Sequence, residues 1–540
     1  MICWTHNHCP KTEFISQSIE FGYNIIFHIQ INIMYRHLIT FIISLIPIGF
    51  LLITVVVPLW AMLQYDDSAP LWREILSDDY YRNRLIWTIF QAACTSILAI
   101  VLALPMGWAL ARLQFIGRNW LIKLMMLPFI MPTLVAGMGV LALFGEHGIV
   151  WQGWQDTPYL LIYGNIFFNL PVAVLAAQQG FQAVPASRLA AIQTLGANAW
   201  QRFYHAELPV LRNWLIGAMC LIFLYCFSGF GLALLLGGQK YATIEVEIYQ
   251  LIAYELDMSR ATVLVWLVLG VTALAGGAFA WLSRRPIGKI QTRQPEKPRG
   301  IKQKCVLGFL WLMWGFFCVL PLGAVVFRAA LSVDGWTILT DDDTLIAIKN
   351  TLKFTSLTLL LALILGLTHA ALARRVQWIR SITFLPFMIS PVCLAFGVLL
   401  KYPDWSDDLT LLISLYALLA YPFVTKDILA KWDTLPEHYF QAVRVLGANR
   451  FQAAFWVTLP LLLPAMRRGL TFAAATCVGE FAATLFLSRP EWTTLTTLIY
   501  QKLGKVGAEN YQQALILTVL LMSLAILVFL LLDKQHDKGN

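Results

Sequence analysis

Two groups of residues in this 540-residue chain have side chains that could do chemistry. Cys3, His6, His8 and Cys9 lie close enough to ligate a metal ion, and Glu480 is an acid inside a long apolar stretch. We favour no metal site, because the four N-terminal residues belong to an extension ahead of an ordinary membrane-protein start. The chain shows no Cys-x-x-Cys pair and no Ser/His/Asp grouping, so the sequence predicts no catalytic centre.

Glu480 is the stronger candidate for a functional site. An ionisable residue within a membrane span is costly and marks a pathway by default. A lone carboxylate there would suit a cationic solute, and the neighbouring Gly479 would permit a bend. In an internal repeat described below, Glu480 corresponds to Gly229, which follows Ser228. We therefore take Ser228, Gly229, Gly479 and Glu480 as candidate pathway residues; the alternative is a polar contact between packed helices.

The composition is that of an integral membrane protein. Hydrophobic residues make up 59% of the chain and charged residues 13%, against roughly 25% charged residues in soluble domains. Apolar runs of about 20 residues, the length that crosses a bilayer, recur throughout. We predict an all-α polytopic fold with about twelve spans: 39–63, 87–111, 121–144, 158–178, 213–236, 261–283, 306–329, 348–373, 381–400, 409–429, 462–487 and 511–533.

Loop charges predict the orientation of these spans. Lys and Arg concentrate in 112–123, 284–304 and 374–380, whereas acids concentrate in 64–84 and 334–343. Because cytoplasmic loops carry the excess of Lys and Arg, both termini are expected in the cytoplasm of a bacterial inner membrane protein. The net charge of +9 belongs to this topology and does not indicate nucleic-acid binding.

The chain contains a long internal repeat. Residues 171–250 align without a gap with residues 422–501, each position 251 residues after its counterpart. Two six-helix halves with the same orientation form a parallel repeat, related by an axis along the membrane normal. We expect an N-terminal extension at 1–33 that is disordered or not native. A first half at 36–283, a basic cytoplasmic linker at 284–305 and a second half at 306–535 follow it.

A polar loop occurs once in each half, at 189–209 and at 440–460. Apolar residues at three-residue spacing, such as Leu189, Ile192 and Leu195, suit one face of a short helix. Gly196 and Gly447 follow, and glycine readily adopts the positive φ of a turn. A second short helix then precedes the next membrane helix. The pattern predicts a helix–elbow–helix on the cytoplasmic face whose aromatic residues fill a groove on a partner.

This loop resembles the permease signature of binding-protein-dependent ABC importers. That signature reads Glu-Ala-Ala, three residues, Gly, nine residues, an aliphatic residue, one residue and Leu-Pro. Both copies keep the spacing of 13 from glycine to proline, but Ala190 and Gln441 replace the opening acid. The fused halves, with Phe-Asn-Leu-Pro at 168–171 and Leu-Leu-Gly-Gly at 235–238, resemble the thiamine and ferric-iron permease branch.

The resemblance implies a type I ABC importer fold and a transport subunit that is not itself an enzyme. It also implies a separate ATPase, which we expect to be a homodimer, a periplasmic solute-binding protein and contact with membrane lipid. The chain has no Gly-x-x-x-x-Gly-Lys-Ser/Thr phosphate loop, so ATP would be bound by that partner and no cofactor by this chain. The residues expected to couple to the ATPase are Leu189, Ala190, Ala191, Gly196, Ala197, Leu208, Pro209, Gln441, Ala442, Gly447, Ala448, Leu459 and Pro460.

Three functions compete for this sequence. The first is a permease subunit that moves a small cation, thiamine-type cargo before ferric iron. The second is a twelve-helix ion-coupled secondary transporter, which also has parallel halves but needs ionisable residues in several spans. The third is a membrane scaffold without transport. The duplicated loop favours the first, whereas a loop helix that only anchors in lipid headgroups would not need to be repeated.

Overall fold

A computed structural model describes residues 45–533, apart from gaps at 66–68, 155–156, 284–293, 333, 384–385, 387–388, 406 and 488. Within these residues all regular elements are helices, and a single isolated β-bridge joins Leu113 to Glu296. The expected extension at 1–33, with Cys3, His6, His8 and Cys9, lies outside the described residues. The first part of the expected linker, 284–293, also lies outside them.

The elements fall into two series that repeat along the chain. The first half contains η1 (Leu52–Val56), α2 (Val57–Tyr65), α3 (Ala69–Ser77), α4 (Asp79–Arg112), α5 (Arg118–Leu124), α6 (Leu127–Ile130), α7 (Thr133–Phe144), α8 (Pro158–Gln182), α9 (Ala186–Thr194), α10 (Ala199–Arg202), η2 (Phe203–Glu207), α11 (Leu208–Phe227), α12 (Phe230–Leu236), α13 (Ile244–Gln250), η3 (Leu251–Glu255) and α14 (Met258–Ser283). The second half contains α15 (Ile301–Trp314), η4 (Gly315–Val319), α16 (Leu320–Leu331), η5 (Asp334–Thr340), α17 (Asp342–Ala373), α18 (Gln377–Ile382), α20 (Pro391–Lys401), η6 (Pro403–Trp405), α21 (Leu409–Asp433), α22 (Glu437–Val445), α23 (Arg450–Ala453), η7 (Ala454–Thr458), α24 (Leu459–Val478), α25 (Ala482–Phe486), η8 (Pro490–Trp492), α26 (Leu495–Leu503) and α27 (Ala508–Asp533).

The expected multi-span fold is confirmed, with some spans broken. In the described part of the chain, ten helices are long and apolar enough to cross a membrane. An eleventh span is a bent pair, Arg118–Ile130 with Thr133–Phe144, whose axes differ by 98°. The expected span at 381–400 ends in the short helix α20, of which Ser390 is the N-cap.

Proline explains why the expected continuous helices at 121–144 and 381–400 are wrong. The residue before a proline is driven out of the helical region, and Met131 (ψ 139°) and Ser390 (ψ 138°) are both extended. Pro132 and Pro391 then stand at the beginning of α7 and α20, where a missing N–H costs little. Each half therefore carries a break at the corresponding place.

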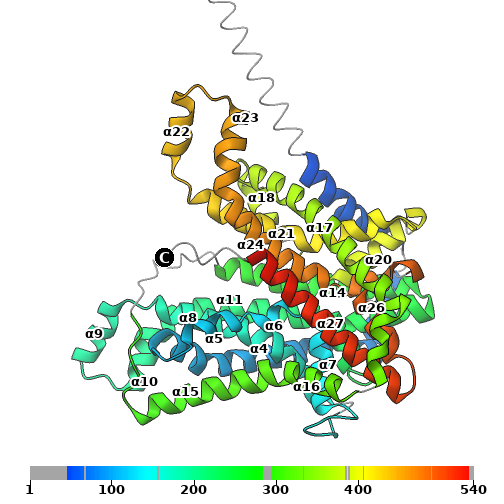
Figure 1. Cartoon of the computed structure of the whole chain (residues 1–540), viewed down its shortest axis with the longest axis horizontal. Coiled ribbons are helices and arrows are strands. Elements are labelled where there is room, and N and C mark those ends of the chain that lie inside the picture. Colours follow the sequence, from blue (N-terminus) through cyan, green and yellow to red (C-terminus); the bar gives the residue numbers. More distant parts are fainter. Residues whose placement is uncertain are drawn as a thin grey trace, which may run out of the picture.

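Packing within each half follows the repeat. In the first half α4 packs on α8 and α11, and in the second half their counterparts α17, α21 and α24 pack in the same way. The first helices of the halves instead pack across the repeat. Helix α2 lies on α20 of the second half, and α15 and α16 lie on α4 and α7 of the first (Figure 1). The halves are thus interlocked.

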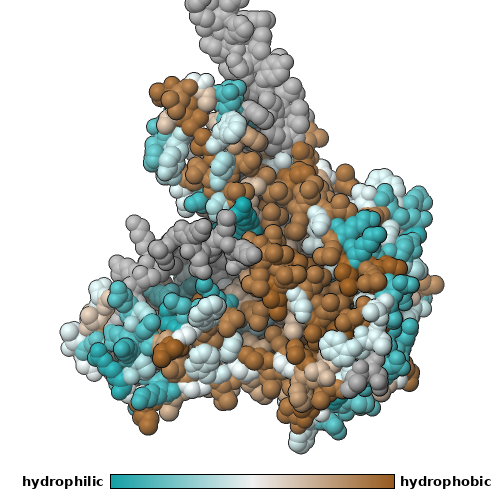
Figure 2. All heavy atoms as spheres, in the orientation of Figure 1, coloured by the Kyte–Doolittle hydropathy of each residue, from teal (hydrophilic) through white to brown (hydrophobic). Residues whose placement is uncertain are grey.

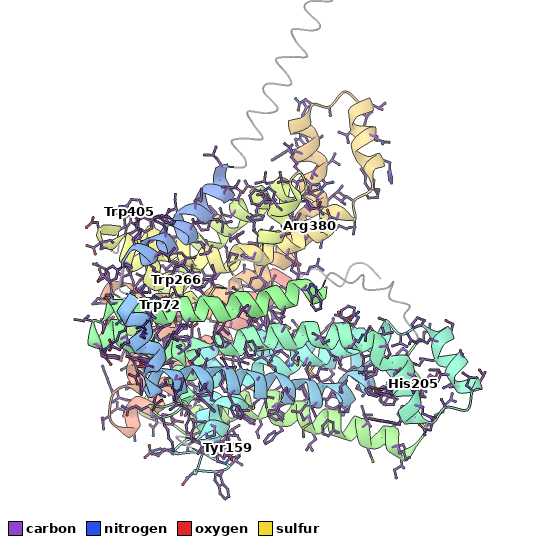
Figure 3. The ribbon with its side chains drawn as sticks, turned by 180° about the vertical axis from the view of Figure 1, so that it is seen from behind. Trp72, Tyr159, His205, Trp266, Arg380 and Trp405 are labelled. Atoms are coloured by element: carbon purple, nitrogen blue, oxygen red, sulfur yellow. The ribbon has the colours of Figure 1, made fainter. Side chains whose placement is uncertain are left out.

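The surface shows the belt expected of a membrane protein. Hydrophobic side chains cover the middle of the face in Figure 2, and hydrophilic side chains gather at its left and right ends. His205 and Arg380 lie toward one end of the molecule and Trp405 toward the other (Figure 3). The helices that protrude at the His205 end, α9 with α10 and α22 with α23, are the two repeated loops (Figure 1).

Candidate coupling elbows and transport cavity

The first elbow, residues 186–207, is a helix, a glycine turn and a second helix. Helix α9 ends where Gly196 takes a φ of +73°, and the Ala197 N–H donates to the Ile192 carbonyl at 3.3 Å. This is the left-handed glycine that commonly ends helices. The side chain of Asn198 accepts from the Gln201 N–H at 2.8 Å, and Gln201 Oε1 accepts in return from the Asn198 N–H. The reciprocal pair is a capping box that starts α10.

The second elbow, residues 437–458, repeats this geometry almost atom for atom. Gly447 has a φ of +77°, and the Ala448 N–H donates to the Val443 carbonyl at 3.2 Å. The side chains of Asn449 and Gln452 exchange the same two bonds with the backbone, at 2.8 and 2.9 Å. The positive φ predicted for both glycines is therefore present in both copies.

Two details of the expected elbow are wrong. The second short helix is not separate, because a π-helical turn (η2 or η7) joins it to α11 or α24 in one continuous helix. Pro209 and Pro460 lie at the N-terminal positions of α11 and α24, within that helix. Leu189 is buried and Ile192 half-buried, but Leu195 is 82% exposed because α9 has already ended before it.

Each elbow exposes large apolar side chains at its tip. In the first elbow Trp200 is 71% and Tyr204 55% exposed, and in the second Leu446 is 84% and Trp456 73% exposed. Most of the expected coupling residues are also exposed: Ala190, Ala191, Gly196, Gln441, Ala442, Gly447 and Pro460. Ala197, Leu208, Pro209, Ala448 and Leu459 are half-buried. The two elbows expose these apolar side chains at one end of the molecule (Figure 1).

The structure brings all four candidate pathway residues to one cavity. Ser228 and Gly229 lie at the break between α11 and α12, and Gly479 and Glu480 at the break between α24 and α25. The cavity has a volume of about 320 Å³ and is lined by both halves. A Cβ on Gly479 would lie 3.0 Å from the Cα of Pro132, so glycine favours this close approach between the halves.

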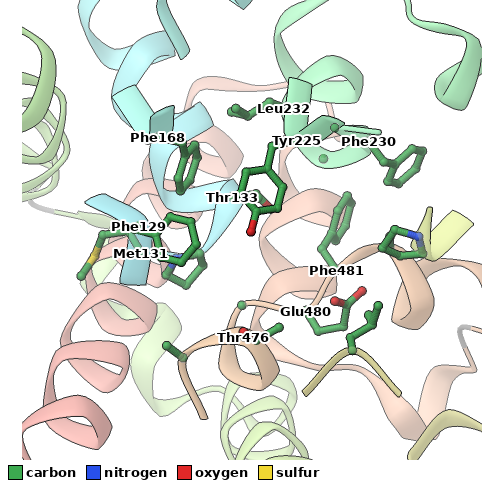
Figure 4. A pocket seen from close by; sticks show the side chains of 18 of the residues that line it. Phe129, Met131, Thr133, Phe168, Tyr225, Phe230, Leu232, Thr476, Glu480 and Phe481 are labelled. Carbon is green, nitrogen blue, oxygen red and sulfur yellow. The ribbon is translucent and has the colours of Figure 1, made fainter. Parts of the chain in front are cut away.

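Glu480 is the only charged side chain that lines the cavity among the described residues. Its Oε1 accepts the Ala483 N–H at 3.0 Å, which also caps the first turn of α25. This bond is a local cap three residues along the chain and not the contact between packed helices considered as the alternative. Half-buried, the carboxylate points toward the cavity, with Tyr225 on the far side (Figure 4). The same carboxylate caps a helix and lines the cavity.

Aromatic rings form much of the wall. Phe129, Phe168, Tyr225, Phe423 and Phe472 line the cavity together with Phe230 and Phe481 (Figure 4). Phe230 and Phe481 occupy equivalent positions in the repeat and stack on each other, with centroids 6.0 Å apart and planes 23° apart. Behind this pair, Tyr249 packs on Phe230 and its counterpart Tyr500 packs on Phe481. The two halves meet in an aromatic layer.

A buried amide cluster beside the cavity is absent from the sequence prediction. Asn165 Nδ2 donates to Gln91 Oε1 at 2.9 Å, and Gln91 Nε2 donates to the Cys226 carbonyl at 2.8 Å. Asn169 Nδ2 donates to the Asn165 carbonyl, one turn earlier in the same helix, at 2.8 Å. Asn165 and Asn169 also line the cavity. Their spacing of four within one apolar helix is the signal that could have revealed them.

Fold and site together define a two-half membrane permease with a cavity between its halves and a pair of elbows at one end. A family model for the inner membrane component of binding-protein-dependent transport systems matches residues 103–288 and 358–539. The chain belongs to this family. It is thus a multi-pass inner membrane permease subunit of an ABC importer, which works with a solute-binding protein and an ATPase that binds the ATP. The family assigns it to ABC importers rather than to ion-coupled secondary transporters.

Curated relatives extend over nearly the whole chain. The thiamine transport system permease protein ThiP of Haemophilus influenzae is 27% identical over 503 residues, which cover 87% of this chain and 91% of the relative. ThiP of Escherichia coli is 26% identical over 520 residues, which cover 89% of this chain and 93% of the relative. The molybdenum transport system permease protein ModB of Azotobacter vinelandii is 30% identical over 173 residues, or 30% of this chain and 76% of the relative.

Proposed function

We propose that this permease carries thiamine from a periplasmic binding protein to the cytoplasm through the cavity between its halves. The observation that carries the proposal is the pairing of a lone carboxylate, Glu480, with walls of aromatic rings. Thiamine is an organic cation with two flat aromatic rings joined by a methylene group. Aromatic faces attract such cations, by about 0.5–2 kcal/mol for each well-placed contact. A carboxylate in a low-dielectric site adds a charge partner.

The size of the cavity and the relatives support the same cargo. Its volume of about 320 Å³ is within the range of roughly 300–1,000 Å³ that small-molecule sites have. The relatives that match both halves of the chain are named thiamine permeases. Bare ferric iron would call for several hard oxygen ligands, whereas the charged lining among the described residues is Glu480. Thiamine is therefore preferred over ferric iron.

The elbows are the proposed docking sites for the ATPase. Both present exposed apolar tips on a rigid glycine turn, and the two turns share the same hydrogen bonds. Two equivalent elbows suit a partner with two equivalent grooves, and the simplest such partner is a homodimer. In this arrangement the elbow end faces the cytoplasm with both chain termini, and the binding protein docks at the opposite end. Closure of the ATPase dimer would draw the elbows together and rock the halves about the cavity.

Reconstituted vesicles test this function. Vesicles containing the permease, its ATPase and a thiamine-loaded binding protein should take up thiamine only with ATP, and thiamine should stimulate ATP hydrolysis. Uptake should survive collapse of the proton gradient. Stimulation by a ferric-loaded binding protein and not by the thiamine-loaded one would overturn the cargo. Uptake that persists without ATP would overturn the coupling.

A further inference from the structure

A second cavity, of about 220 Å³, lies at the base of the first elbow. It is enclosed by the end of α4, by α9 and η2, and by the linker residues that precede α15; in Figure 1 α10 and the start of α15 meet at the lower left. It is distinct from the transport cavity and shares no lining residue with it. The transport function proposed above assigns no ligand to this second cavity.

The charges around this second cavity are unbalanced. Four cations line it, Arg112, Arg202, Lys297 and Arg299, against the two acids Glu207 and Glu296. Arg112 Nη2 lies 3.7 Å from Glu207 Oε1, so Glu207 forms an ion pair with Arg112. Among the described residues no ion pair joins Arg202, Lys297 or Arg299 to a carboxylate, although the charge of Arg202 also acts on Glu207. Arg202 Nε is buried there without a hydrogen-bond partner. The pocket therefore has a surplus of positive charge.

The linker is fixed in place on both sides of its two cations. The Glu296 N–H donates to the Arg112 carbonyl at 2.9 Å, and the Glu296 carbonyl accepts the Gln114 N–H at 2.8 Å. Three residues later the Arg299 N–H donates to Gln303 Oε1 at 2.9 Å, just ahead of α15. The backbone between these anchors holds Lys297 and Arg299 at the mouth of the cavity. Their charges are thus presented by ordered backbone.

We propose that this pocket binds a phosphate-bearing anion, supplied either by the headgroup of an anionic phospholipid or by a soluble phosphate ester. Arginine forms bidentate, charge-assisted hydrogen bonds with phosphate oxygens, and lysine adds a point charge. Basic pockets beside membrane helices are suited to phosphate headgroups for the same reason. Neutral or cationic ligands are disfavoured by the surplus of arginine and lysine.

The ligand would connect the linker to the first elbow. Leu189 and Gln193 of α9 line the same cavity as Lys297 and Arg299. A bound phosphate would therefore hold α9 against the linker and stiffen the first elbow. In the described residues nothing comparable braces the second elbow.

Two arms of one experiment separate the sources of phosphate. In the first, pyrophosphate is titrated into the detergent-solubilised full chain and its binding measured by calorimetry. In the second, native mass spectrometry counts phosphatidylglycerol retained by the chain from mixed-lipid membranes. Both arms compare the wild type with a K297A/R299A variant and with a K302A/K304A control, which removes two exposed charges of the same linker region that do not line the pocket.

The proposal expects the K297A/R299A variant to bind one of the anions about tenfold more weakly, as the loss of charge-assisted bonds predicts. The control should bind like the wild type. A loss in the first arm identifies a soluble phosphate, and a loss in the second identifies a lipid. Equal binding by the variant and the control in both arms overturns the proposal. If the alanine variant melts at a lower temperature than the control, K297Q/R299Q replaces it, and the same outcomes decide.

Discussion

The elbows and the helix breaks descend from the same repeat, but they have diverged to different extents. The two elbows share a left-handed glycine and a capping box with the same bonds. At the breaks, Glu480 of the second half corresponds to Gly229 of the first. In α8 and α21, which have equal length, Asn165 and Asn169 correspond to Tyr416 and Ala420. We expect surfaces that meet a symmetric partner to stay alike, whereas walls that meet one asymmetric small molecule need not. The difference fits the docking role proposed for the elbows and the transport role proposed for the cavity.

The largest effect should come from breaking both elbows at once. In a G196V/G447V variant, each side chain would be forced into a left-handed conformation that costs roughly 1–2 kcal/mol or more. We expect ATPase docking and thiamine uptake to fall by at least about tenfold. Co-purification of the ATPase and vesicle uptake provide the measurements. G308V is the matched control, because Gly308 has open space around it on α15. Intact docking in the double variant would mean that the elbows are not the coupling sites.

The next largest effect should come from removing the charge that only the second half contributes to the cavity. E480Q removes the charge but keeps an oxygen that can accept the Ala483 N–H, so the cap on α25 is retained. Thiamine uptake should fall by about tenfold, as loss of one charge partner predicts, while ATPase docking stays unchanged. E491Q, at an exposed site outside the cavity, is the control. Equal uptake in both variants would remove Glu480 from the pathway.

A smaller and symmetric effect is expected from the stacked rings. Phe230 and Phe481 are each other's counterparts, so F230L and F481L should destabilise the protein to a similar degree. The double variant should cost less than the sum of the two, by about 0.5–1.5 kcal/mol of shared stacking energy. Unfolding in mixed micelles at increasing denaturing detergent gives these free energies. Strict additivity would show that the rings do not interact.

The smallest effect tests the capping boxes. N198A and N449A each remove a side-chain oxygen that caps a helix, at a cost of about 1 kcal/mol. In the absence of a bound phosphate, hydrogen exchange of the α10 and α23 amides should rise about fivefold in the affected elbow only, with a similar rise in each variant. Markedly unequal rises would show that one elbow is held by something besides its own cap. A bound phosphate at the first elbow predicts the smaller rise in N198A.

Much of the site was predictable because it depends on local chemistry. A glycine followed by Ala-Asn dictates the turn in both elbows, and an acid in an apolar run identifies Glu480. Other features depend on contacts between distant segments. The pairing of Arg112 with Glu207 and the β-bridge from Leu113 to Glu296 join residues that no periodicity relates. The exposure of Leu195 follows from where α9 ends, which a spacing of three cannot specify.

The exchanged first helices have a consequence for how this protein is made. Helix α2 is synthesised early, yet its packing surface belongs to α20, which leaves the ribosome only after the whole first half and the linker have been inserted. Until then Pro58 and Met62, buried against the second half in the finished protein, face lipid or an insertion chaperone. A first half made alone would keep that surface exposed and be open to membrane proteases. Fusion of the halves into a single chain guarantees the missing partner in a fixed ratio of one to one.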